Sequence, residues 1–247
     1  MDSLNCLNKS TIVLLHKNNL LFPLIKSEIQ NRELSNIKIS KDSKIEALQK
    51  FLKQQNLPDQ KSFEKWKEIN NLTDSEVENL ALNEIKLKKY CKDKFIKQAD
   101  SRFLERKSDL DIIVYSLLRV KDNDKARELY LRIDDKEAEF SELASKYSEG
   151  IEKKTCGIVG PIPIGSAHPI LIKHLQNKPL GEVQPPIKID DLYIIVRVES
   201  YEPAKLDNFM REKMSLELFN NWLVSKSQAI CQKLLEKLET SDQAWQE

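Results

Sequence analysis

The sequence predicts an α+β protein in which helical blocks at both ends enclose a segment that contains strands. Apolar residues recur at helical spacing through residues 1–109 and again from Leu206 to Leu238. Between these blocks, continuous apolar runs at 111–120 and 192–199 have the length and β-branched content of strands. With only 5 glycines and 7% aromatic residues, the chain lacks the turn residues that an all-β sandwich requires.

The first block predicts several helices. Residues 20–34 and 43–57 each place their apolar side chains on one face, and the second run ends before Pro58, which disfavours helix at the residue before it. The sequence from Thr73 to Glu76 is a capping box, so a long helix is expected to begin there and to continue past Phe103.

The middle of the chain predicts alternating elements in a recognisable order. In sequence they are a strand at 111–120, helices at 123–133 and 138–149, a glycine-containing segment at 156–160, the turn segment Leu180-Gly-Glu-Val-Gln-Pro-Pro-Ile187 and a strand at 192–199. This order, with these turn motifs, resembles the parvulin type of peptidyl-prolyl cis-trans isomerase, the PpiC or rotamase family. The resemblance covers roughly ninety residues.

The resemblance also implies an architecture. It is similar to that of SurA- and PrsA-type chaperones, in which N- and C-terminal segments form one helical, chaperone-like lobe and a parvulin-like domain is inserted, with a small antiparallel sheet flanked by helices. The expected boundaries are 1–109 for the N-terminal lobe, 110–203 for the parvulin-like domain and 204–247 for a C-terminal helix that packs back on the lobe. The apolar face of that helix needs such a partner.

The family's catalytic residues are replaced at the matching positions. Ser116 stands where the first family histidine is expected, and a shift of one residue brings no histidine there. Ile194 takes the place of the second histidine, and Gly150 that of the family's cysteine or aspartate. Rotation about an X–Pro bond crosses a barrier of ~18–20 kcal/mol without covalent chemistry, so an apolar grip alone can assist it. Weak or absent catalysis is therefore expected.

The family's proline-binding shelf is altered as well. Its positions correspond to Val159, Ala167 and Leu171, which remain apolar but are smaller than the family residues. A shallower substrate-binding surface is expected, at a cost of ~0.8 kcal/mol for each methylene lost from the contact. The alternative for Leu171 is that it only packs the short helix onto the sheet.

The resemblance implies a protein that assists folding by binding extended or proline-containing polypeptide clients. A purely non-catalytic peptide-binding chaperone or adaptor is the main alternative, and a dimerisation protein built on the long helices is a third. The oligomeric state stays open.

Composition narrows the other classes. Lysine and arginine (40) balance aspartate and glutamate (39), so no net field favours nucleic acid. The three histidines (His16, His168 and His174) have no metal-ligand spacing and are interpreted as surface residues, and no phosphate-binding loop occurs, so neither a metal nor a cofactor is expected.

The four cysteines are expected to be buried or half-buried free thiols, because they lie far apart in the sequence. The apolar run Thr11–Leu15 is too short for a signal peptide or a membrane span, which leads us to expect a cytoplasmic protein without membrane association.

Overall fold

The computed structural model describes residues 6–176 and 178–243, and it is an α+β structure, as the sequence predicts. The chain divides into two compact units. The helical unit comprises Met1–Arg102 and Asp207–Glu247, and the sheet unit comprises Phe103–Leu206.

Among the described residues, six helices contribute to the helical unit. They are α1 (Lys9–Lys17), α2 (Leu21–Ser35), α3 (Lys41–Gln54), α4 (Gln60–Asn70), α5 (Asp74–Leu110) and α9 (Asn208–Gln243). The predicted capping box begins α5: the Glu76 amide donates to the Thr73 hydroxyl at 3.3 Å, and the Thr73 amide donates to the Glu76 carboxylate at 2.7 Å. The short apolar run near the N-terminus forms α1, with Ile12 buried and Leu14 exposed.

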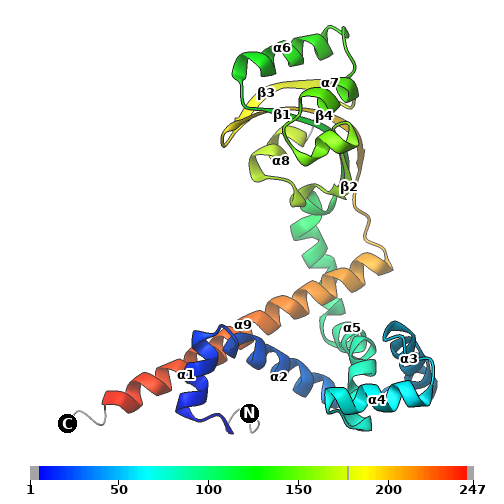
Figure 1. Cartoon of the computed structure of the whole chain (residues 1–247), viewed down its shortest axis with the longest axis vertical. Helices are drawn as coiled ribbons and strands as arrows, with labels where there is room; N and C mark the ends of the chain where they lie inside the picture. Colours follow the sequence, from blue (N-terminus) through cyan, green and yellow to red (C-terminus); the bar gives the residue numbers. More distant parts are fainter. Residues whose placement is uncertain (1–5, 177, 244–247) are drawn as a thin grey trace. The chain divides into compact units, whose positions relative to one another are not determined.

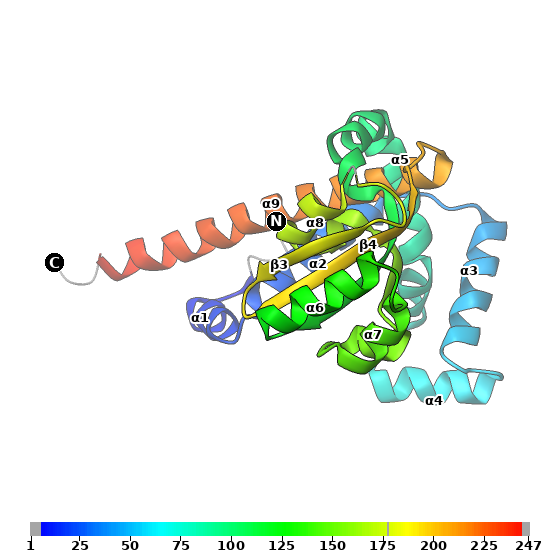
Figure 2. The ribbon, with the colours of Figure 1, turned by 90° about the horizontal axis from the view of Figure 1, so that it is seen from above.

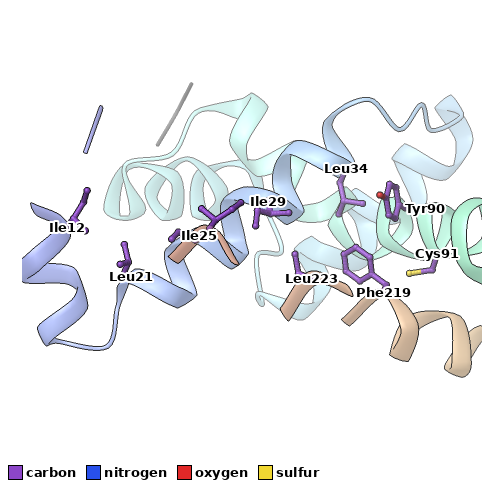
Figure 3. Packing of buried hydrophobic residues seen from close by; sticks show 10 residues of the cluster. Ile12, Leu21, Ile25, Ile29, Leu34, Tyr90, Cys91, Phe219 and Leu223 are labelled. Atoms are coloured by element: carbon purple, nitrogen blue, oxygen red, sulfur yellow. The ribbon is translucent and has the colours of Figure 1, made fainter. Parts of the chain in front are cut away.

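The core of the helical unit forms where α9 contacts α2 and α5 (Figure 3). Phe219 and Leu223 of α9 pack in one cluster with Ile25 and Ile29 of α2, and Tyr90 of α5 meets Phe219 edge to face at 5.6 Å between ring centroids. The apolar face of the C-terminal helix is thus buried against segments more than a hundred residues away in sequence.

One carboxylate is held at the edge of this core. Glu33 accepts hydrogen bonds from the Tyr90 hydroxyl at 2.9 Å and from the Lys226 ammonium at 3.1 Å. Burial opposes ionisation of Glu33, but these two hydrogen bonds outweigh it and hold the pKa of the carboxyl below its usual value. The three helices α2, α5 and α9 are therefore linked by polar as well as apolar contacts.

The sheet unit is built on four antiparallel strands in the order β2-β1-β4-β3. Their bounds are β1 (Ile112–Val120), β2 (Ile158–Pro163), β3 (Val183–Ile189) and β4 (Leu192–Glu202). The two edge strands, β2 and β3, carry all the prolines of the sheet, namely Pro161, Pro163, Pro185 and Pro186. Proline lacks an amide donor, which is why it is tolerated at an edge and not in a central strand.

The two faces of the sheet have different covers, and the covering helices lie on opposite sides of it (Figures 1 and 2). We name them the α6/α7 face, covered by α6 (Asn123–Asp134) and α7 (Phe140–Tyr147), and the α8 face, covered by α8 (Pro169–Leu175). Because successive strand residues alternate between faces, Leu118 and Ile195 belong to the α6/α7 face, whereas Leu117 and Ile194 belong to the α8 face.

Two of the four cysteines are more exposed to solvent than the sequence predicted. Cys91 is buried and Cys231 half-buried, but Cys6 and Cys156 are exposed. Cys156 ends a 3₁₀ turn in the left-handed conformation, with φ at 52°, and such a turn leaves little structure to cover the thiol.

Within the described residues, no group of three or more His, Cys, Asp or Glu side chains is placed to hold a metal ion. Over the same residues, no helix combines the length and the apolar character needed to cross a membrane.

Candidate functional site

The α8 face brings together most of the residues that the sequence singled out. Leu171 of α8 and Ile194 of β4 are only 4% and 6% exposed, and they share one apolar cluster. Val159 of β2 and Ala167, just before α8, are half-buried and pack against the same cluster. The four side chains therefore surround a single surface, with Leu171 in its buried part.

Ser116 does not belong to this surface. It lies opposite Arg197 of β4, and its hydroxyl donates to the Glu199 carboxylate on the α6/α7 face. Strand alternation explains the difference, because Ser116 is three ladder positions from the partner of Ile194 and so points the other way. Ser116 and Ile194, which were both expected at positions of the family's catalytic histidines, therefore lie on opposite faces of the sheet. Leu117, and not Ser116, shares the α8-face cluster with Ile194.

Gly150 lies beside a buried ion pair that the sequence reasoning did not find. The Arg119 Nε donates to the Glu152 carboxylate at 3.0 Å, and Arg119 Nη2 donates to its second oxygen. A Cβ added at Gly150 would lie 2.0 Å from Arg119 Nη2, so no larger side chain fits at this position without moving the pair. The space beside Gly150 is thus filled by an arginine and a glutamate.

Hydrogen bonds to Ser148 complete this polar cluster. The Ser148 hydroxyl donates to Glu152 and accepts from the Arg119 amide at 3.1 Å, which ties β1 to the turn after α7. Glu152 is 3% exposed, and its burial favours the neutral acid. The hydrogen bonds from Arg119 and Ser148 outweigh that effect and lower the pKa of Glu152, so the pair is ionised at neutral pH.

Tyr115 adds another polar group to the α8 face. Its ring is 4% exposed and packs in the cluster of Leu171 and Ile194, and Val159 lies directly opposite on β2. Burial raises the pKa of its phenol, although the nearby Arg119 opposes that rise. At neutral pH Tyr115 is therefore a neutral hydroxyl donor.

The histidines take no part in this arrangement. His16 belongs to the helical unit. His168 is exposed and caps α8, with its Nδ1 accepting from the Ile170 amide at 3.3 Å. His174 is half-buried in the last turn of α8, and it is not a member of the α8-face cluster.

A sequence signal existed for part of the missed cluster. Tyr115, Leu117 and Arg119 alternate along β1, so locating the buried face would have placed all three on the α8 face. Nothing local indicates Glu152, because its partner lies 33 residues away in sequence.

The chemistry available on the α8 face is apolar contact with a few neutral donors. The apolar side chains that remain partly exposed around the buried cluster are aliphatic: Val159, Ile162, Ala167, Ile172, Ile187 and Leu192. Such a surface suits an uncharged, extended chain better than an anion or a metal.

A protein-family model matches the part of the chain that contains this site. Residues 118–200, about a third of the chain, match the rotamase family model, which describes a PPIC-type PPIASE domain. The sheet unit therefore contains a parvulin-type domain of the rotamase family, as the sequence indicated. A search of the curated proteins gives no match.

Solved structures show similarity over longer stretches. The peptidylprolyl isomerase PrsA from Bacillus anthracis is 20% identical, with 83% of this chain and 94% of that chain covered and a TM-score of 0.49. PrsA from Bacillus cereus is 18% identical, with coverages of 94% and 88% and a TM-score of 0.47. The parvulin domain of PpiD from E. coli is 24% identical, with coverages of 40% and 95% and a TM-score of 0.34.

Proposed function

We propose that this protein assists protein folding by binding extended or proline-containing polypeptide segments on the α8 face, with weak or absent isomerase activity. The observation that carries the proposal is the rim of partly exposed aliphatic side chains on this face of a rotamase-family domain. An extended chain laid across that rim buries apolar area on both partners, which favours association.

Weak catalysis is expected because of the side chains that form the floor of the site. The floor consists of Leu117, Ile194 and Val196, each less than 8% exposed, and none can exchange a hydrogen bond with a twisted amide. Binding that is equally strong for the planar and the twisted bond lowers KM without raising kcat. A surface of this kind therefore holds a prolyl segment more effectively than it rotates the bond.

One observation favours the non-catalytic adaptor as the second candidate. The Arg119–Glu152 pair fills the space beside Gly150, where the family carries its third polar group. With that space filled, and with Leu171 only 4% exposed, the adaptor function implies a shallow apolar surface. Such a surface suits reversible recognition of many segments without chemistry.

Two measurements test the proposal. Binding to an array of unstructured, proline-containing peptides reports on recognition, and a protease-free assay of X–Pro exchange by NMR reports on catalysis. We expect binding with exchange no more than about tenfold above the uncatalysed rate. An array without bound peptides would refute the binding function, and fast exchange would refute the claim of weak catalysis.

Adjacent residues of β2 provide a matched pair of variants. Val159 points to the α8 face, whereas Ile158 is 41% exposed and alternates to the other side. Val159→Asp should abolish peptide binding, and Ile158→Asp should leave it unchanged, because the same charge on the same edge strand then lies away from the surface. Equal effects of the two substitutions would place the binding surface elsewhere.

A further inference from the structure

Two polar groups on the α8 face have no hydrogen-bond partner within the protein. In the described residues no group pairs with the Tyr115 hydroxyl, and the Nη1 of Arg119 is likewise unpaired, while its Nε and Nη2 are engaged by Glu152. Over the same residues, every fully buried side-chain nitrogen or oxygen has a hydrogen bond. The Tyr115 hydroxyl and Arg119 Nη1 therefore reach the solvent, although the Tyr115 ring is buried.

The strand pairing on both sides of β1 is irregular next to Tyr115. The pairing of β1 shifts register just before this residue in both ladders, between Ile113 and Tyr115 toward β2 and between Val114 and Tyr115 toward β4. In both ladders the extra residue lies on the partner strand, between Val159 and Ile162 of β2 and at Glu199 of β4, so the alternation along β1 is unbroken. Bulges are frequent beside binding sites. The Tyr115 ring lies opposite Val159, at the aliphatic rim.

The charge around Arg119 determines which kind of acceptor group these two donors can bind. Glu152 is buried against the guanidinium and neutralises it, and Arg119 is held through two of its nitrogens. A compensated arginine with one free edge is a directional N–H donor more than a source of positive field. Its natural acceptor is an uncharged carbonyl oxygen rather than a carboxylate or a phosphate.

We propose that Tyr115 and Arg119 are the specificity-determining donors of this site, and that they hold backbone carbonyl groups of an uncharged, extended peptide whose apolar side chains contact the aliphatic rim. This rests on the proposed peptide-binding function and names the residues and the ligand chemistry that carry it. The two side chains leave the same face of β1 four residues apart, so they can donate to carbonyl oxygens that also lie on one side of an extended chain.

Tyr115→Phe tests the first donor with the least disturbance. It removes one hydroxyl that has no partner in the protein, so the melting temperature should not fall. Affinity for an acetylated and amidated peptide such as Ala-Ala-Ala-Pro-Phe should fall about threefold to tenfold, as expected for one lost hydrogen bond. Tyr193→Phe is the control, because Tyr193 packs on the α6/α7 face, and it should bind as wild type does.

The second donor is tested on the wild-type protein, so the answer does not depend on a variant that folds. Addition of the same peptide should shift the NMR resonance of the Arg119 Nε–H group, while that of Arg197, on the α6/α7 face, stays in place. Glu152→Gln should in addition convert the site to a preference for a peptide with glutamate before proline, because the guanidinium is then uncompensated.

The outcomes separate this inference from the proposed function. If the wild-type protein binds no peptide, the binding function itself fails. If it binds, but Tyr115→Phe binds equally well and Arg119 does not shift, the α8 face recognises peptides by apolar contact alone and this inference is overturned. A wild-type preference for the glutamate peptide over the uncharged one would also overturn it.

Discussion

The two faces of the sheet differ in how completely they are covered. On the α6/α7 face, Leu118, Leu129, Phe140 and Ile195 are fully buried, and three of the four partly buried members of the cluster are tyrosines. On the α8 face a single helix of seven residues covers the cluster, and the partly exposed apolar side chains around it are aliphatic. Exposed aliphatic area has no hydrogen bond to offer water. Under the proposed function we therefore call the α8 face the recognition face and the α6/α7 face the structural face.

The largest expected effect concerns the structural face. Phe140→Ala should lower the free energy of unfolding by about 3–5 kcal/mol, because the ring is fully buried between α7 and the sheet. Urea denaturation followed by circular dichroism measures it. Ile187→Ala, at the rim of the other face, should cost only about 1 kcal/mol, since a half-buried side chain has little transfer energy to lose. Equal costs would remove the distinction between the faces.

The next effect concerns the ion pair of the recognition face. Glu152→Gln should lower the free energy of unfolding by about 1–3 kcal/mol at pH 7, because it leaves a partly buried arginine without its charged acceptor. Urea denaturation of both proteins at pH 7 provides the value. A neutral or stabilising substitution would show that the pair contributes nothing to the fold.

The same variant has a defined pH dependence. Since the folded pKa of Glu152 is lowered, its contribution is fully present above the unfolded carboxyl pKa of about 4.3 and is lost as the pH falls through the folded value. The difference in stability between wild type and Glu152→Gln should therefore shrink between pH 5 and acid conditions of about pH 2. A difference that grows as the pH falls would contradict the assignment.

A third prediction is that isomerase activity can be introduced on the recognition face. Leu117→His with Ile194→His should raise the X–Pro exchange rate at least about tenfold, or 1.4 kcal/mol, because both side chains lie on the α8 face of adjacent strands. Ser116→His with Ile194→His should not, because its two imidazoles lie on opposite faces. Both variants need a thermal melt, since a buried imidazole without a partner is unfavourable. A faster Ser116 variant would contradict the assignment of faces.

The smallest expected effect is that of salt on peptide binding. Because Glu152 neutralises Arg119, affinity for an uncharged peptide should change by less than about twofold between 0.05 and 0.5 M NaCl, a range over which screening of exposed charges increases strongly. Isothermal titration measures it, and the Glu152→Gln variant with the glutamate peptide is the salt-sensitive comparison. A steep salt dependence for the wild-type protein would indicate recognition by net charge.

The secondary structure follows from local signals in the sequence. The capping box at Thr73, the apolar strand from Ile112 and the helical spacing after Asn123 each specify their element through neighbours within a few residues. The prolines at 161 and 185 confined their strands to the edges of the sheet, since proline removes a ladder hydrogen bond. The match of residues 118–200 to the rotamase family agrees with this local order.

Only the tertiary structure determined which side chains come together at the site. The face that Ser116 takes depends on which side of β1 meets α8, and this does not follow from alternation within one strand. The pairing of Arg119 with Glu152, and the space it takes beside Gly150, join segments 33 residues apart. Short-range preferences specify elements because they act within a turn or a strand, whereas a site is assembled by contacts between side chains that only the packed sheet brings together.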